Sequence, residues 1–482
     1  MSDPLSNLEP RALWRHFLEL SRIPRGSRNE AAAAAWVAEQ GRALGCEVQR
    51  DAAGNVLLRQ RAAPGQEGRP TVALQAHADM VCEKNEGTVH DFERDPIDVY
   101  RDGDVLRARG TTLGADNGIG VAAALAVLGD RELLHGPLEV LVTVDEETGL
   151  TGANALRPGW LGAKYLLNLD SEEEGELTIG CAGGLDTVAS RRVSRSAPAA
   201  GRVALRVKVS GLKGGHSGTD IAAGRGNSLR ILGQVLAALA AQGPLELAAV
   251  RGGNKRNAIP REASAVLLAD PARAAALRAE VARQESAWRA ALGAFDPGLS
   301  IAVEEAAAAP VLAAADARAV VGLLLAGPHG VEAMSPDIPG LVQTSTNLGV
   351  IETREDAVEV NFLTRSALDA SKEALAARIA GTAALAGFEV RQSGGYPGWK
   401  PEPGAPLVAL VDGVHEELFG KRMLVRAIHA GLECGLIGPK YPGLQMVSFG
   451  PTMWDAHTPD ERVSIPSVQS FWKLLRGVLE RV

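Results

Sequence analysis

The chain has little cysteine and no long apolar run. Its 482 residues include four cysteines, Cys46, Cys82, Cys181 and Cys434, which lie far apart without a Cys-x-x-Cys pair. This spacing argues against a disulfide framework and a thiolate zinc site. No apolar run approaches the ~18 residues of a membrane span, and the first ten residues lack the basic and then apolar pattern of a secretion signal. We therefore expect a cytoplasmic protein with no membrane partner.

Positive charge and aromatic residues are also scarce. Lys and Arg number 50 against 58 Asp and Glu, which gives a net charge of −8, and no basic stripe is interleaved with aromatics. Nucleic acid is therefore not an expected partner. Aromatics make up only 4%, and alanine runs such as residues 31–35 predict helices that pack through small side chains. The length predicts at least two domains.

The first third of the chain alternates between helix and strand patterns. Residues 7–20 and 29–44 are predicted helices, and residues 118–128 form a third apolar helix. Strand-like runs lie between them at residues 47–51, 55–60, 71–77, 138–144 and 165–170. This alternation predicts an α/β fold, a mixed sheet flanked by helices, with ligands at the carboxyl ends of the strands.

The middle of the chain has a different pattern. Residues 183–201 show no strong apolar period and suggest a crossing into a second domain, and residues 394–406 are a Gly/Pro-rich crossing back. Between them, strands at 203–211 and 358–364 accompany long helical patterns, which is typical of an α+β domain. We predict a discontinuous first domain of residues 1–186 and 396–482, interrupted by an inserted domain of residues 187–395.

Acidic and histidine side chains follow the apolar runs of the first domain. They are His77 and Asp79 after residues 71–76, Asp116 in a glycine-rich turn, the pair Glu146-Glu147 after residues 138–144, Asp170 after residues 165–169, and His457 near the C-terminus. Together they supply ligands for two divalent metals and leave one carboxylate for catalysis. Asp116 is the predicted bridge between the metals, because its flanking glycines permit close approach.

Each of these residues also has a simpler interpretation. The Glu146-Glu147 pair is typical of a solvated helix start, and Asp116 and Asp170 could each be a helix N-cap. His457 alone could be a loop histidine. Asp79, two residues after His77, could bind metal itself or hold the second nitrogen of the imidazole.

Ordered blocks along nearly the whole chain carry a more specific signal. They read QAHADMV, GADNGIG, DEETGLTGA, NLDSEEEGE, GCAGG, GLKGGHSGTDI, GRGN, NAIPREA, HAGLECG and SFGPTMWDAHTPDERV. In these blocks the chain resembles the co-catalytic zinc peptidases of the aminoacylase and glutamate-carboxypeptidase type, most of all the aminoacyl-histidine dipeptidases. HAD stands where relatives often have HLD or HTD, a difference in a variable residue. The resemblance implies a zinc domain interrupted by a lid domain, and a cis peptide bond after Asp116.

The resemblance also implies how the ligands divide between two metals. Glu147 and His457 would bind one metal, His77 and Asp170 the other, and Asp116 both. Asp79 would orient His77. Glu146 would be the general base for a water held between the metals and would pass the proton to the leaving amine. The expected metal is Zn, with Co or Mn as alternatives.

The inserted domain contributes a second set of candidates. His216 lies between glycines in GLKGGHSGTDI; it could be a structural turn residue, whereas the resemblance implies that it stabilises the oxyanion. Asn257 and Arg365 are candidates to hold the substrate carboxylate, although Arg365 could be a surface charge. Gly431 and Glu433 are expected to line the cleft, with Glu433 meeting the substrate ammonium.

The resemblance further implies a homodimer through the lid, in which His216 reaches the partner's site in related dimers. The strand at residues 203–209 could pair across such an interface as an edge strand.

The expected function is hydrolysis of unblocked dipeptides, including Xaa-His and beta-Ala-His. The alternatives on the same scaffold are an N-acyl amino-acid deacylase and a carboxypeptidase. A non-catalytic binding protein would have lost a metal ligand or the base, and all of these residues are present.

Overall fold

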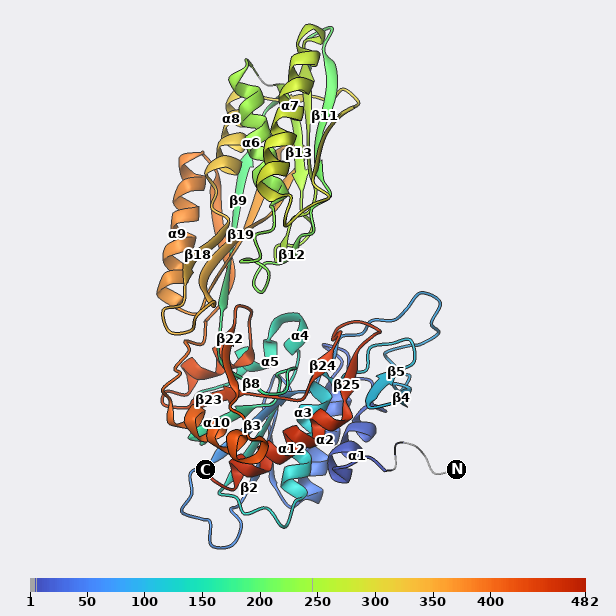
Figure 1. Ribbon diagram of the computed structural model, residues 1–482, viewed down its shortest axis with the longest axis vertical. Coiled ribbons are helices and arrows are strands. Elements are labelled where there is room, and N and C mark those ends of the chain that lie inside the picture. The colour runs from blue at the N-terminus through green and yellow to red at the C-terminus, as the bar shows by residue number, and fades with distance from the viewer. Residues whose placement is uncertain (1–4, 6, 245) are drawn as a thin grey trace. The chain divides into compact units, whose positions relative to one another are not determined.

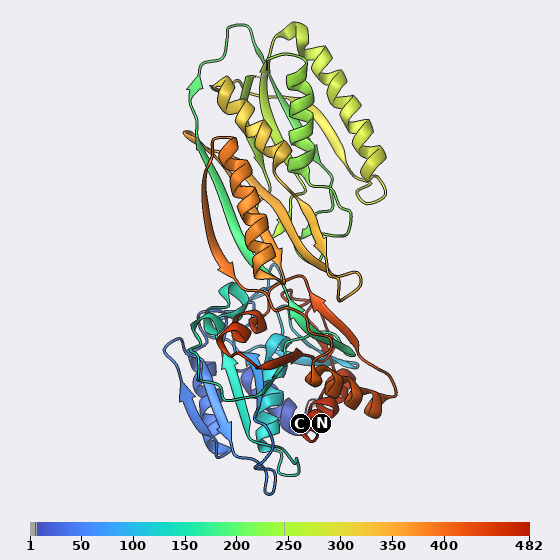
Figure 2. The same cartoon turned by 90° about the vertical axis from the view of Figure 1, so that its left-hand side faces the viewer.

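The chain passes between two structural units four times (Figures 1 and 2). The computed structural model describes residues 5, 7–244 and 246–482. Unit 1 contains the described residues up to Gly180, with Trp399–Ala427 and Leu432–Val482, and unit 2 contains Cys181–Gly398 and Ile428–Gly431. Residues 1–4 and 6, part of the N-terminal segment considered above, lie outside the described residues. Among those described, no helix is both long and apolar enough to cross a bilayer.

Unit 1 is built on an eight-stranded mixed sheet in the order β1-β2-β6-β3-β7-β23-β8-β22. Its strands are β1 (Glu47–Arg50), β2 (Val56–Gln60), β3 (Val72–His77), β6 (Leu138–Thr143), β7 (Tyr165–Asn168), β8 (Glu176–Cys181), β22 (Leu424–Ile428) and β23 (Gln445–Ser448). A smaller sheet joins β4 (Val99–Asp102), β5 (Val105–Ala108), β24 (Met453–Trp454) and β25 (Arg462–Ser464).

The helices of unit 1 pack around these strands. They are α1 (Arg11–Leu20), α2 (Ala31–Ala43), α3 (Ala115–Gly129), α4 (Glu146–Gly149), α5 (Thr151–Ala155), α10 (Pro406–Phe419), α11 (Glu433–Ile437), the 3-10 helix Gly438–Lys440 and α12 (Ile465–Leu479). The alanine-rich α3 is buried almost throughout, as expected of a helix that packs through small residues.

The centre of this sheet is parallel. Strands β6, β3 and β7 are neighbours, and β3 pairs in parallel with both of the others. All six residues of β3 and of β6 are buried, which explains their continuous apolar runs. Because the three strands are parallel, their carboxyl ends meet at one edge of the sheet.

Unit 2 contains one large antiparallel sheet, covered by four helices. Its strands are β9 (Gly183–Arg192), β11 (Val203–Ser210), β13 (Glu246–Gly252), β15 (Ala263–Ala269), β16 (Ser300–Glu305), β18 (Gly330–Met334), β19 (Val342–Thr353), β20 (Ala357–Ser366) and β21 (Glu389–Tyr396). Two small sheets pair β10 (Arg195–Ser196) with β17 (Val311–Leu312) and β12 (Gly215–His216) with β14 (Ala258–Ile259). The helices are α6 (Ser228–Ala241), α7 (Pro271–Leu292), α8 (Ala314–Ala326) and α9 (Asp369–Leu385).

Two expectations about this unit are wrong. Residues 183–192 are the ten-residue strand β9 and not an irregular crossing; small and charged residues hide its alternation in the sequence. The strand at residues 203–209 is not an edge strand, because β11 lies between β16 and β15. A β11-to-β11 pairing across a dimer is therefore excluded.

The sheet of unit 2 consists of two copies of one topology. Strands β11, β13, β15 and β16 with α6 and α7 form a βαββαβ module, and β9, β19, β20 and β21 with α8 and α9 form another. The strand order β16-β11-β15-β13 continues as β19-β20-β9-β21, so the second module repeats the first in reverse. The modules join where β13 and β19 pair antiparallel, and α6 packs against α8 above this junction. The first module is inserted into the second after β9.

Candidate metal centre and substrate residues

The carboxylate of Asp116 has a different histidine at each of its oxygens. Its Oδ1 lies 3.0 Å from His77 Nε2, and its Oδ2 lies 3.0 Å from His457 Nε2. Asp170 Oδ1 lies 3.2 Å from His77 Nε2, and Glu147 Oε2 lies 3.0 Å from His457 Nε2. Five side chains thus form two groups of three that share Asp116, and within each group one atom per residue lies within 4.8 Å of the others.

The fold of unit 1 explains how these residues meet. His77 ends β3, Glu147 lies in the short helix after β6, and Asp170 follows β7 by two residues. These are the adjoining carboxyl ends of the three central parallel strands. His457 comes from the turn between β24 and β25, and Asp116 stands at the start of α3, where its peptide bond to Asn117 is cis.

The charge balance of the cluster favours a cation. Burial raises the pKa of Asp170 to about 6, against the opposing effect of His77, and the nearby carboxylates act in the same direction as burial. Burial also raises the pKa of Glu147. Carboxylates that are crowded and desolvated are costly to ionise unless positive charge is present.

Unpaired atoms point to the same conclusion. Within the described residues, Glu147 Oε1 is buried and has no hydrogen-bond partner, and Asp170 Oδ1 is buried with His77 Nε2 as its contact at 3.2 Å. Such atoms are expensive in a folded protein, and divalent cations satisfy carboxylate oxygens and imidazole nitrogens together. The five side chains therefore fit two divalent metal ions, with Asp116 able to contact both.

Asp79 supports this cluster from behind. Its Oδ1 lies 3.4 Å from His77 Nδ1 and accepts a hydrogen bond from the backbone N–H of Glu146 at 3.0 Å. Its Oδ2 accepts from the N–H of Glu147 at 3.2 Å and from the hydroxyl of Ser27 at 2.8 Å. Burial opposes ionisation, but bonds from His77 and these other donors lower the pKa of Asp79 to about 2. Asp79 therefore lies against the imidazole of His77 and binds both backbone N–H groups of the Glu pair.

Glu146 points toward the same centre. One of its oxygens lies with atoms of His77 and Glu147 within a 4.8 Å group. Burial raises the pKa of Glu146 well above its usual range, with further contributions from neighbouring carboxylates. A carboxylate in such surroundings has the increased basicity that a general base requires.

Two residues that position the cluster were not found from the sequence. Glu461 accepts four backbone N–H bonds from residues 113–116, at 2.7 to 3.3 Å. The fully buried Arg25 donates to the carbonyls of Ala78, Asp79 and Gly114. Gly114 has a φ of +70°, and a Cβ there would lie 2.5 Å from the Arg25 guanidinium, so this loop requires glycine. The only sequence signal was the place of Glu461 four residues after His457.

Glu433 is completely buried in unit 1. Its Oε2 accepts hydrogen bonds from Gln75 Nε2 at 2.5 Å and from the Thr143 hydroxyl at 2.7 Å. Its Oε1 has no partner among the described residues. Burial raises the pKa of Glu433 to about 8. These bonds tie the residue to Gln75 on β3 and Thr143 on β6. Its expected contact with a substrate ammonium stays a prediction.

The remaining candidates lie in unit 2, and several of them adjoin one another. Arg365, on β20, is 5% exposed, and its NH2 lies 3.3 Å from His216 Nε2 on β12. Its NH1 donates to the Tyr396 hydroxyl at 3.3 Å, and a Cβ at Gly431 would lie 3.1 Å from that ring. Asn257 is exposed and joins the group through its carbonyl, which accepts from Ser217 N–H at 2.9 Å. Tyr396 was not predicted.

Both ring nitrogens of His216 lie close to hydrogen-bond donors. Its Nδ1 accepts from the backbone N–H groups of Gly218 and Thr219 at 3.3 and 3.2 Å. Burial and the charge of Arg365 lower the pKa of His216, so the ring is neutral at pH 7. A neutral imidazole has one N–H and one acceptor nitrogen, and here Nδ1 faces backbone N–H donors while Nε2 lies 3.3 Å from the Arg365 guanidinium, which is also a donor.

The chain is similar to one peptidase family and to known proteins over their full length. Residues 73–481 match Peptidase family M20/M25/M40. The cytosol non-specific dipeptidase of Escherichia coli strain K12 is 42% identical over 479 residues, covering 99% of each chain. The aminoacylhistidine dipeptidase of Vibrio alginolyticus is 43% identical and superposes with a TM-score of 0.93, over 100% of this chain and 98% of that one. Aminopeptidase PepT of Bacillus cereus, 18% identical with a TM-score of 0.57, covers 98% of both chains and shares the fold.

Proposed function

Because the chain belongs to Peptidase family M20/M25/M40, we propose that it is a metal-dependent dipeptidase acting on unblocked dipeptides, Xaa-His and beta-Ala-His among them. The observation that carries the proposal is the Asp116 carboxylate, which offers one oxygen to each of two three-residue ligand groups. The full-length similarity to two proteins named as dipeptidases, one of them an aminoacylhistidine dipeptidase, supports this choice of substrate.

In this proposal His77 and Asp170 hold one ion, Glu147 and His457 hold the other, and Asp116 holds both. Two divalent ions, when bound, polarise the scissile carbonyl and lower the pKa of water. Zn is the proposed metal, and Co or Mn would suit the same oxygen and nitrogen donors.

Glu146 moves the protons of the reaction. Its carboxylate accepts a proton from the attacking water and then donates it to the amine that leaves. Asp79 holds both backbone N–H groups of the Glu pair, so the base keeps its place beside the ligand Glu147. The raised pKa of Glu146 suits a group that must take up a proton and release it within one cycle.

His216 and Arg365 act on the same substrate from unit 2, which serves as the lid. His216 Nε2–H donates to the oxygen that becomes negative when the carbonyl is attacked. Arg365 pairs with the terminal carboxylate, because its planar fork suits two carboxylate oxygens. Asn257 and Gly431 shape the surroundings of this carboxylate, and the contact of the buried Glu433 with the substrate ammonium stays a prediction.

The proposal extends to the assembly and location of the protein. In this proposal the protein is a homodimer through the lid, as the resemblance implies. It is also cytoplasmic, as the name of its Escherichia coli relative suggests. Sedimentation of the metal-loaded protein measures the first property, and fractionation of the source cells measures the second.

Metal removal tests the function. Prolonged chelation should abolish hydrolysis of beta-Ala-His, and Zn, Co or Mn should restore it with two ions bound per chain. An N-acetyl amino acid should be a poor substrate, because the proposed site recognises a free amine. Full activity in protein shown to be free of metal would refute the proposal, and preference for the N-acetyl compound would reassign the substrate.

A further inference from the structure

One face of the inserted module carries a row of charged and polar side chains. In β11 the residues Leu205, Val207 and Val209 are buried in the core with the helices, whereas Arg206 and Lys208 alternate with them and face away. Ser264 of β15 pairs in register with Lys208 on one side and with Arg251 of β13 on the other. Three neighbouring strands therefore present Lys208, Ser264 and Arg251 side by side on the face that the helices leave open.

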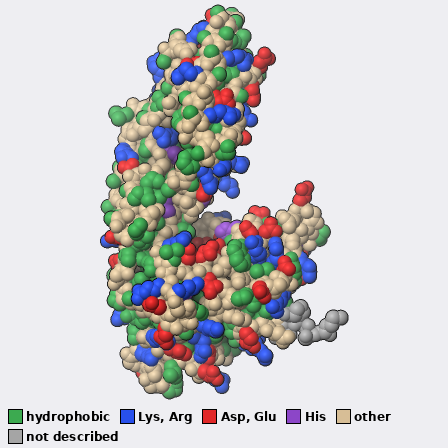
Figure 3. Space-filling view, in the orientation of Figure 1, with side chains coloured by type: hydrophobic (Ala, Val, Ile, Leu, Met, Phe, Trp, Pro, Cys, Tyr) green, Lys and Arg blue, Asp and Glu red, His purple; other side chains and the backbone are tan. Residues whose placement is uncertain are grey.

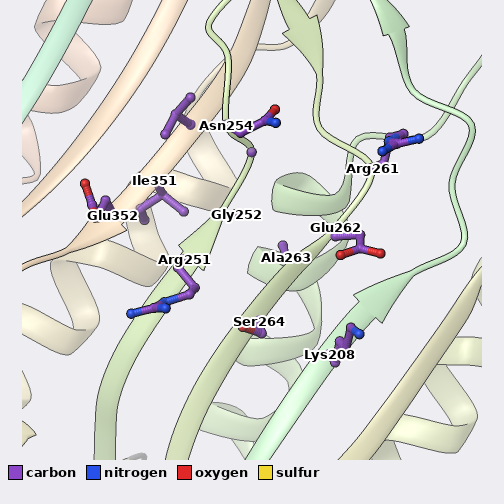
Figure 4. Close-up of a pocket in the computed structure, with 12 residues that line it drawn as sticks. Lys208, Arg251, Gly252, Asn254, Arg261, Glu262, Ala263, Ser264, Ile351 and Glu352 are labelled. Carbon is purple, nitrogen blue, oxygen red and sulfur yellow. The ribbon is translucent and has the colours of Figure 1, made fainter. Parts of the chain in front are cut away.

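This row lines a cavity of about 560 Å³ (Figure 4). The small Ser264 lies between Lys208 and Arg251, and Arg261, Glu262 and Asn254 come from the loops at one end. The cavity reaches the junction of the two modules, where the backbone of Arg251 on β13 stands opposite that of Glu352 on β19 in the antiparallel ladder. Its volume lies within the range of about 300–1,000 Å³ that is typical of small-molecule sites.

The cations of the cavity have no protein counter-ion. Across the described residues, the side chains of Lys208, Arg251 and Arg261 form no ion pair and donate no hydrogen bond. Glu352 already pairs with Arg354 outside the lining, at 3.3 Å. Lys and Arg side chains gather on unit 2 near β12 (Figure 3). In a chain of net charge −8, this is a local reversal of sign.

We propose that this cavity binds a small polyanion, a molecule with two or more carboxylate or phosphate groups. Lys208 and Arg251 stand on strands that flank β15, so their backbones are about 10 Å apart at the usual strand spacing. A molecule with two or more anionic groups can pair with Lys208, Arg251 and Arg261 at the same time, whereas a single small anion leaves part of their charge uncompensated. Glu262, also in the lining, disfavours additional negative charge at its end of the cavity.

The test is isothermal titration calorimetry on the full-length, metal-loaded protein. The probes are propane-1,2,3-tricarboxylate and fructose 1,6-bisphosphate, with acetate and inorganic phosphate as comparators that carry a single anionic group. We expect saturable binding of at least one multiply charged probe and much weaker binding of the comparators. Binding of the tricarboxylate alone identifies a polycarboxylate site, and binding of the bisphosphate alone identifies a phosphate site. Absence of saturable binding by either probe overturns the proposal.

Variants then assign the binding to this cavity. Lys208→Gln and Arg251→Gln should each weaken binding about tenfold or more, because each removes a charge-assisted hydrogen bond. Glu262→Gln should strengthen binding, a result that misfolding does not imitate. Arg318→Gln is the control: Arg318 is an exposed arginine on α8 and does not line this cavity. If Arg318→Gln weakens binding as much as Arg251→Gln, the attraction is diffuse and the site is rejected.

Discussion

Glu461 holds the backbone of Asp116. Its Oε1 accepts hydrogen bonds from the N–H groups of Ala115 and Asp116, and its Oε2 accepts from Leu113 and Gly114. Glu461 is 2% exposed, so these bonds are shielded from water. The loop that presents the shared carboxylate is therefore fixed by a residue at the opposite end of the sequence.

Glu461→Gln should lower both stability and metal occupancy. Each carboxylate oxygen accepts from two backbone N–H groups. The amide of Gln replaces one of these oxygens with an NH2 donor, so two of the four N–H groups lose their acceptor. The expected loss is about 2–3 kcal/mol of unfolding free energy. Denaturant unfolding of metal-free protein and metal analysis of loaded protein measure the two effects. Glu39→Gln, at an exposed site on α2, is the control, and an equally small effect of both changes would contradict the role given to Glu461.

The two members of the Glu pair should respond differently to substitution. Glu146→Gln should reduce kcat by about 10²–10⁴, the usual contribution of a positioned base, and leave metal content unchanged. Glu147→Ala should instead lower metal content. Metal analysis beside steady-state kinetics separates the two, and loss of metal in Glu146→Gln but not in Glu147→Ala would reverse the assignment.

Arg365→Ala should distinguish substrates by their C-terminus. The buried guanidinium would lose its ion pair with a free carboxylate, so kcat/KM for dipeptides should fall about 30-fold or more. The same change should affect C-amidated dipeptides much less. Arg318→Ala, an exposed arginine on α8, serves as the control. Equal losses on free and amidated substrates would assign Arg365 to structure alone.

His216→Ala should lower kcat by about 10²–10³ and leave the metals bound, because one donor to the developing oxyanion is removed. Steady-state kinetics and metal analysis measure this. A purely structural turn histidine would instead lower thermal stability and leave kcat unchanged.

Mixing variants shows which chain each His216 serves. If subunits exchange and His216 acts on its partner, combining His216→Ala with Glu146→Gln creates one intact site in every mixed dimer, and activity reappears. If His216 acts within its own chain, every site keeps one defect. A mixture of His216→Ala and Arg365→Ala should stay inactive in both cases, because the two residues adjoin within one unit 2.

Glu433→Gln should change how stability depends on pH. The pKa of Glu433 is about 8 in the fold against an ordinary value of 4.5. Between these values the unfolded chain releases a proton that the folded chain keeps, so this carboxyl makes the protein less stable as pH rises from 4.5 to 8. The amide has no such penalty, and the variant should gain stability relative to the wild type across that window. Denaturant unfolding of metal-free protein at pH 5 and pH 8 measures the difference, and a constant difference would contradict the raised pKa.

The sequence predicted the core of unit 1 well because local patterns define it. The apolar runs that end at His77, Thr143 and Asn168 are the three central parallel strands, and acidic or histidine side chains follow each of them. Arg25 and Glu461 were missed because they bond to backbone atoms of distant segments, and no local pattern reports such contacts.

The sheet of unit 2 was harder to predict for a similar reason. Whether β11 is central or at an edge depends on β16, whose residues pair with those of β11 across 90 to 100 positions of the chain, and such non-local pairing is hard to predict from local patterns. The repeated topology was hidden because the first module interrupts the second after β9.

The reversed strand order of unit 2 affects which substitutions its sequence can accept. When two identical chains form a symmetric dimer, each substitution appears in both halves. Here the segments that meet at β13 and β19 are encoded separately, so a change in one leaves the other as it was. His216 comes from one copy and Arg365 from the other, so either residue can change without the same change in the other copy.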